Sequence, residues 1–140
     1  MKTEILEYLM EISEVNKQDI FGNSPLHLIC ENKKINTEII KIFSEKKANF
    51  NIKNTSGKTP FFNATLNKNC NFEILDFLIE FDCDPNHLDN SGKSCFHLCC
   101  FQNKVSFKLL DYLLEKNADC NLLNRFGRSP IHFACKKIFF

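Results

Sequence analysis

The sequence predicts an all-α fold, a solenoid built from repeated helix–turn–helix units. Two observations lead to this prediction. The four glycines of the 140-residue chain lie at positions 22, 57, 92 and 127, so that successive glycines are 35 residues apart. Each interval also carries an apolar run with helical periodicity. A constant period of this length is typical of a repeat array, in which each unit buries its apolar face against its neighbours.

Further columns of residues keep the register of the glycines. Asparagine lies six residues before each glycine, Asp or Asn three before, a hydroxyl residue two after, and proline three after in three units of four. The aligned residues are Asn16, Asn51, Asn86 and Asn121; Asp19, Asn54, Asp89 and Asn124; Ser24, Thr59, Ser94 and Ser129; and Pro25, Pro60, Cys95 and Pro130. Asp or Asn before glycine is turn chemistry, with glycine supplying a positive φ. A hydroxyl residue followed by proline predicts the N-cap and first position of a helix.

Each unit is therefore expected to hold a short first helix behind the cap and a longer second helix after a polar turn. The second helices carry apolar residues at helical spacing. These are Ile39, Ile40, Ile42 and Phe43; Ile74, Leu75, Phe77 and Leu78; and Leu109, Leu110, Tyr112 and Leu113. Residues 3–12 are expected to form a lone second helix that caps the array, with Glu4, Glu7 and Glu11 giving it a polar outer face.

The segments behind the caps resemble the signature of the ankyrin-repeat family. The matching segments are Ser24-Pro-Leu-His-Leu, Thr59-Pro-Phe-Phe-Asn-Ala and Ser129-Pro-Ile-His-Phe-Ala. The repeat ends that begin at Ala48, Cys83 and Ala118 are similar to the family's Ala-Asp-Val-Asn. Phe62 and Cys95 depart from the signature, and the period exceeds the usual length of about 33 residues. The two extra residues fall in the turn between the helices, near 32–36, 67–71 and 103–106.

The resemblance implies a single domain over residues 1–140. Its expected parts are a capping partial repeat at 1–15, full repeats at 16–50, 51–85 and 86–120, and a partial repeat at 121–140. It also implies a non-catalytic protein–protein interaction module that meets its partner at the turn tips and on the exposed face of the first helices. Glu31, Asn32, Leu66 and Asn67 are expected on that face. The candidate partner-binding residues are Ile20, Phe21, Asn23, Lys58, Lys93, Phe101, Arg125, Phe126 and Arg128.

The chemistry of these candidates predicts the kind of partner. Aromatic residues and arginine are the usual anchors of interfaces. Lys58, Lys93 and Arg128 share one column and would line a basic stripe. The expected partner is another protein that offers an acidic or phosphorylated segment with an apolar anchor. The alternative interpretation is that these phenylalanines and lysines are ordinary surface residues of a Phe-rich and Lys-rich chain.

Composition argues against several other classes. The 18 basic and 17 acidic residues give no global basic field, which disfavours nucleic-acid binding. No apolar run approaches the length of a membrane helix, and no signal peptide is apparent, so the cytosol or nucleus and reduced thiols are expected. No phosphate loop or catalytic constellation appears. We therefore expect no enzyme, no small-molecule substrate and no cofactor.

Three alternatives stay open. The unfinished unit at 121–140 fits a fragment of a larger regulatory protein, such as a ubiquitin-ligase adaptor or kinase, in which the array recruits substrate. The His-x-x-Cys pairs, and the exposed thiols expected at Cys70 and Cys120, would fit a metal or thiol sensor. However, neighbouring helices stand about 8–10 Å apart, too far for two pairs to share one zinc ion. We expect the histidines to fix turns and Cys30, Cys99, Cys100 and Cys135 to be small buried residues. Finally, Asn51, Asn86 and Asn121 match the asparagine that hydroxylases modify in ankyrin repeats, although bracing of the hairpin is the expected role.

Overall fold

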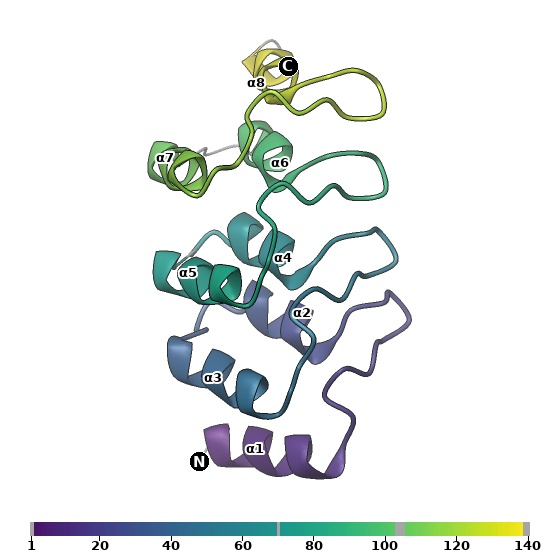
Figure 1. Cartoon of the computed structure of the whole chain (residues 1–140), viewed down its shortest axis with the longest axis vertical. Helices are drawn as coiled ribbons and strands as arrows, with labels where there is room; N and C mark the ends of the chain where they lie inside the picture. The colour runs from purple at the N-terminus through teal and green to yellow at the C-terminus, as the bar shows by residue number, and fades with distance from the viewer. Residues whose placement is uncertain (1, 70, 103–105, 139–140) are drawn as a thin grey trace. The chain divides into compact units, whose positions relative to one another are not determined.

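The computed structural model describes residues 2–69, 71–102 and 106–138. All regular structure in these residues is helical, as the sequence predicts. The helices are α1 (Lys2–Ile12), α2 (Pro25–Glu31), α3 (Thr37–Glu45), α4 (Pro60–Leu66), α5 (Phe72–Glu80), α6 (Cys95–Phe101), α7 (Phe107–Glu115) and α8 (Pro130–Ile138) (Figure 1). The chain forms two compact units, Met1–Cys83 with α1 to α5 and Asp84–Phe140 with α6 to α8. The helices fall within the expected repeats, whose boundaries stay a prediction.

The first helices begin where the Ser/Thr-Pro column predicts. Ser24 is the N-cap of α2 with an extended backbone, and the N-caps of α4 and α6 have the same conformation. The backbone N–H of Ser24 donates to Nδ1 of His27 at 3.1 Å. The histidine three residues into the helix thus satisfies the N-cap N–H, the role that glutamate fills in the usual capping box. Cys95 replaces proline at the start of α6, and that helix has the same length as α2, seven residues.

The second helices bury most of the apolar positions that the periodicity selects. Among those positions, the side chains exposed by 1% or less are Ile40, Phe43, Ile74, Leu75, Leu78 and Leu113. A residue in the left-handed region follows the end of α3, α5 and α7, at φ of 57° to 62° for Lys47, Asp82 and Asn117. After Lys47, the N–H of Ala48 turns back to the carbonyl of Phe43 at 3.0 Å, which closes the helix end. The repeat-end motif therefore begins two residues after the C-cap residue, with the N–H that closes the helix end.

Each unit stacks its repeats in parallel. In the first unit α2 packs against α4 and α3 against α5, and in the second unit α6 packs against α8 (Figure 1). The turns stack as well, because the N–H of Thr55 donates to the carbonyl of Phe21 at 3.0 Å. In the second unit the N–H of Arg125 donates to the carbonyl of Ser91 at 3.3 Å. Within each unit the turn tips therefore project in register beside the row of first helices.

Helix α1 exposes Glu4, Glu7 and Glu11 as predicted, but its surface is not wholly polar. Four of its apolar side chains are exposed and follow helical spacing, and they are Ile5, Tyr8, Leu9 and Ile12. Only Met10 is buried among the described residues of this helix. No helix in the described part of the chain packs closely against α1, whereas α3 and α5 pack against each other. An ion pair of 3.3 Å between Lys46 and Glu11 joins α1 to the end of α3.

Candidate functional site

The turn tips are rigid because an Asp or Asn side chain holds each one. Oδ1 of Asp19 accepts the N–H groups of Phe21 at 2.9 Å and Asn23 at 2.8 Å. Asn54, Asp89 and Asn124 make the same pair of bonds in their own turns. The glycines adopt φ of 74°, 78°, 74° and 67°. The predicted turn chemistry is confirmed in all four turns.

The asparagine column braces one repeat on the next. Oδ1 of Asn86 accepts the N–H of Asp119 at 2.7 Å, and its Nδ2 donates to the carbonyl of Asn117 at 2.9 Å. Nδ2 of Asn51 donates to the carbonyls of Phe81 and Asp82, both at 3.3 Å. The bracing role is confirmed for Asn51 and Asn86, and for Asn121 it stays a prediction.

The histidines tie neighbouring repeats together. Nδ1 of His27 accepts from the N–H of Ser24, and its Nε2–H donates to the carbonyl of Lys58 at 3.0 Å. His97 makes the matching bond to the carbonyl of Arg128 at 2.9 Å. Burial lowers the pKa of His27 below 6.5, although the bond to Lys58 acts in the opposite direction. A neutral ring with both nitrogens engaged is a structural bridge, and among the described residues no three His, Cys, Asp or Glu side chains form a metal-binding cluster.

Most of the described cysteines fill small buried positions. Cys30, Cys83, Cys95 and Cys99 are buried, Cys100 is half-buried, and Cys120 and Cys135 are exposed. The expectation that Cys135 is buried is wrong, because α8 is covered by α6 on one side and by no described helix on the other. Burial raises the pKa of the Cys83 thiol to about 12 and also raises the pKa of the Cys30 thiol. Cys120 is exposed as expected, and Cys70 lies outside the described residues.

In the first unit, the candidate partner-binding residues occupy the turn tips and the adjoining helix face. Ile20 and Phe21 are 89% and 63% exposed at the first tip. The side chain of Asn23 contributes to the scaffold instead, since its Oδ1 accepts from Nδ2 of Asn54 at 2.9 Å. Lys58 is half-buried, and its carbonyl accepts from the N–H of Asn54 at 2.9 Å as well as from His27. The backbone of Lys58 is therefore fixed from two repeats.

A pocket of about 290 Å³ lies beside Lys58 in the first unit. Its lining residues are Glu31, Lys33, Lys58, Asn63, Leu66, Asn67 and Lys68. Sequence reasoning placed Glu31, Leu66 and Asn67 on this face and missed three of the others. Two signals point to the missed residues. Lys33 and Lys68 lie in the lengthened turns between helices, and Asn63 is the one polar residue in a column of Leu28, Leu98 and Phe133.

In the second unit, the equivalent face holds an aromatic cluster. The rings of Phe101 and Phe133 meet edge to face with centroids 6.2 Å apart, and His97 contacts Phe133 in the same manner at 5.2 Å. Nζ of Lys93 lies 5.9 Å from the centroid of the Phe133 ring, within the range of a cation–π contact. The structure thus joins the candidates Lys93 and Phe101 through Phe133, which sequence reasoning did not select.

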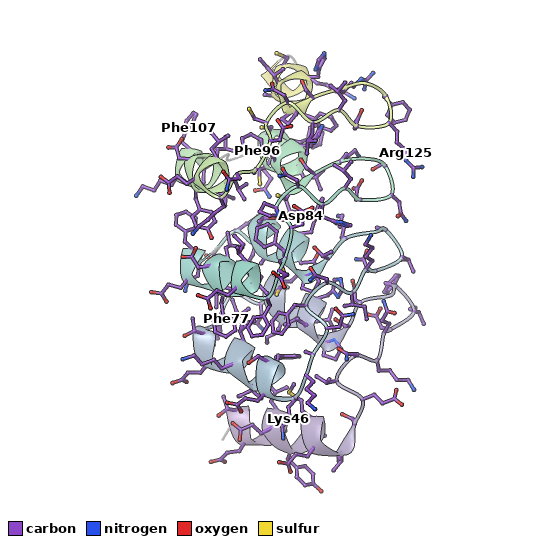
Figure 2. The ribbon with its side chains drawn as sticks, viewed as in Figure 1. Lys46, Phe77, Asp84, Phe96, Phe107 and Arg125 are labelled. Atoms are coloured by element: carbon purple, nitrogen blue, oxygen red, sulfur yellow. The ribbon has the colours of Figure 1, made fainter. Side chains whose placement is uncertain are left out.

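The last turn tip carries the remaining candidates. Phe126 is 75% exposed, and Arg125 and Arg128 are exposed beside it. Figure 2 shows Arg125 at this tip and Phe107 on α7, at opposite sides of the second unit. The exposed aromatic residues of this unit therefore lie on two separate faces, and only one of them carries arginine.

Turns that stack in register, paired helices and bracing columns define the class as a helical-repeat protein. The family model for ankyrin repeats (three copies) matches residues 1–89 and 64–138, and the chain belongs to this family. No curated protein matches the chain. Ankyrin repeats are generally protein–protein interaction modules. Among the described residues, every helix is too short or too polar to span a membrane.

Proposed function

We propose that this chain is a non-catalytic module that binds a partner protein through its turn tips and the exposed face of its first helices. The proposal rests on one observation: two sets of side chains have different roles, one structural and one exposed. The repeat columns engage their polar groups in turns, caps and bridges between repeats, whereas Ile20, Phe21, Phe101 and Phe126 stand exposed on that framework. Large apolar side chains on a rigid support lose little conformational entropy on binding, which suits them as anchors.

The cations on the same faces support an acidic or phosphorylated segment as the binding element. Lys58 lines the pocket of the first unit. In the second unit Lys93 lies over the Phe133 ring, and Arg125 and Arg128 are exposed in the turn that carries Phe126. Complementary charge speeds encounter and rejects wrong partners, while the apolar anchors supply most of the affinity. We infer that the partner offers both an anionic group and an apolar side chain, and that the module acts as a scaffold or adaptor in the cytosol or nucleus.

A capture experiment tests this function. Wild-type chain and a variant with Phe21→Asp, Phe101→Asp and Phe126→Asp are immobilised and exposed to lysate of the source cells. We expect specific proteins to be retained by the wild type and lost by the variant, because a charge replaces each anchor.

The matched control places the same three charges elsewhere. It carries Ile12→Asp, Phe107→Asp and Leu114→Asp, which are 64%, 79% and 45% exposed on α1 and α7. Both variants should keep the far-UV circular dichroism of the wild type. Equal retention by wild type and anchor variant, or equal loss in the two variants, would contradict the proposed surface.

A further inference from the structure

The pocket of the first unit is assembled by two neighbouring repeats and held in place by hydrogen bonds between them. Nδ2 of Asn67 donates to the carbonyl of Cys30 at 3.0 Å and to that of Asn32 at 3.2 Å. These bonds fix the start of one lengthened turn against the end of α2. Lys33 and Lys68, which follow α2 and α4 in the lengthened segments of the repeat, line the same pocket.

The interior of the pocket is polar where the other repeats are apolar. Asn63 is 6% exposed, and its Nδ2 donates to Oε1 of Glu31 at 2.9 Å and to the carbonyl of His27 at 3.4 Å. Leucine occupies the same column in the repeats before and after. A buried amide in place of leucine costs desolvation unless it is hydrogen-bonded, and here that bond orients Glu31 along the wall. The pocket is thus built around polar contacts.

The charge of the lining favours a dianion. Lys33, Lys58 and Lys68 contribute three positive charges and Glu31 one negative charge, a net of two positive charges. In the described part of the chain, none of these three lysines takes part in an ion pair. Lysine offers three N–H donors on a flexible stem, so that three of them can converge on one group. A phosphate monoester carries about −1.5 to −2 charges at pH 7 and three acceptor oxygens, whereas a carboxylate would leave one positive charge uncompensated.

The size of the pocket limits what enters it. A volume of about 290 Å³ is at the lower end for sites that enclose a whole small molecule. It suits one charged side chain that reaches in from a segment lying across α2 and α4. Lys58 is half-buried at the wall, and its carbonyl accepts two hydrogen bonds, while Lys33 and Lys68 are exposed and can close from the rim.

We propose that this pocket binds the phosphate group of a phosphorylated serine or threonine in the partner segment. The inference rests on the proposed function, since it names the anionic group that such a partner offers. It also assigns a role to the lengthened repeat, because a period without the two extra residues would lack the turn positions from which Lys33 and Lys68 reach the pocket.

The test is a titration of the full chain followed by ¹⁵N–¹H NMR. The probe is the capped tripeptide Gly-phosphoserine-Gly, with capped Gly-Asp-Gly and inorganic phosphate as parallel arms. We expect saturable shifts of the side-chain amide of Asn63 and the backbone amides around Lys58. Exchanging Lys33, Lys58 and Lys68 for glutamine should raise the dissociation constant about tenfold, in line with the loss of several solvent-exposed ion pairs.

A second glutamine variant controls for net charge. It replaces Lys41, Lys47 and Lys53, three exposed lysines of the same unit outside the pocket, and should leave the dissociation constant within about twofold. Equal weakening by both variants would show general attraction and overturn the site. Equal affinity for the aspartate peptide, or tighter binding of inorganic phosphate than of the phosphopeptide, would overturn the assignment to a phosphorylated side chain.

The same variants separate this inference from the proposed function. If a partner captured by the wild type is lost with the Phe21, Phe101 and Phe126 variant but retained undiminished by the pocket variant, the module stands and the pocket assignment falls. If the phosphopeptide saturates the pocket while no partner depends on the aromatic anchors, the pocket stands and the proposed function falls.

Discussion

The two units use one framework to present faces of opposite chemistry. Glu31 and Asn63 in the first unit occupy the same positions of the repeat, two periods earlier, as Phe101 and Phe133 in the second. The first pair is joined by a hydrogen bond of 2.9 Å, and the second by an edge-to-face ring contact at 6.2 Å. In both units, meanwhile, the capping histidine donates to the carbonyl of the next repeat at nearly the same distance. Repeat proteins can thus vary their face without altering the bonds that hold the stack together.

The largest loss of folding stability is expected at turn glycines that have no space for a side chain. A Cβ at Gly22 would come within 2.6 Å of the backbone nitrogen of Thr55, and one at Gly92 within 2.8 Å of that of Arg125. A Cβ at Gly127 would meet nothing within 4 Å, although φ is positive there too. At each of the three positions, alanine should cost about 1–2 kcal/mol of stability because the backbone is left-handed there. Crowding should add about 1–3 kcal/mol at Gly22 and Gly92 alone.

Urea unfolding followed by far-UV circular dichroism measures these costs, since the chain has no tryptophan. Gly127→Ala is the control that isolates the shared conformational cost. We expect Gly22→Ala and Gly92→Ala to lower the midpoint by similar amounts and clearly more than the control. A large difference between those two would break the claim that both units share one framework.

That framework is the part of the structure that the sequence could predict. Turn, cap and bracing columns repeat every 35 residues, so that four independent copies of each signal agree on one local structure. The register also fixed which side of each repeat faces outward, and Phe21, Phe101 and Phe126 are exposed there as expected.

The chemistry of each face was less accessible from sequence, because it depends on single residues that break a column. Asn63 stands in a column of leucine and phenylalanine, and Phe133 occupies a position that suggested only helix packing. The exposed stripe on α1 was missed for a related reason. Its periodicity matches that of the buried second helices, and periodicity alone does not reveal whether a covering helix is present.

A smaller effect is expected on the pH dependence of folding stability, through His27 in the first unit. Burial holds the pKa of His27 below 6.5 in the folded chain. As pH falls below about 6.5, the unfolded chain binds a proton at this histidine before the folded chain does. The contribution of the neutral His27 to folding stability is therefore complete above that pH and is lost below it. We expect the urea midpoint of the wild type to fall between pH 7.5 and 5.5 by more than that of His27→Gln. An equal fall in both proteins would show that His27 does not govern this dependence.

The smallest net change in folding stability is expected when Glu31 and Asn63, the polar pair of the first unit, are both made apolar. Glu31→Leu alone leaves the nearly buried Nδ2 of Asn63 with only the 3.4 Å bond to His27, which should cost about 1–3 kcal/mol. Asn63→Leu alone returns the exposed Glu31 carboxylate to water and should cost about 1 kcal/mol. The double variant removes both partners and places leucine where neighbouring repeats already carry it. Its stability should lie within about 0.5 kcal/mol of the wild type.

A double-mutant cycle in urea gives the coupling between the two positions. Costs that simply add would mean that the 2.9 Å bond contributes nothing to folding stability. A near-neutral double variant would show instead that folding does not require a polar pair at this position. Folding stability would then give no reason for Glu31 and Asn63 to differ from Phe101 and Phe133, and the difference would have to lie in what each face binds.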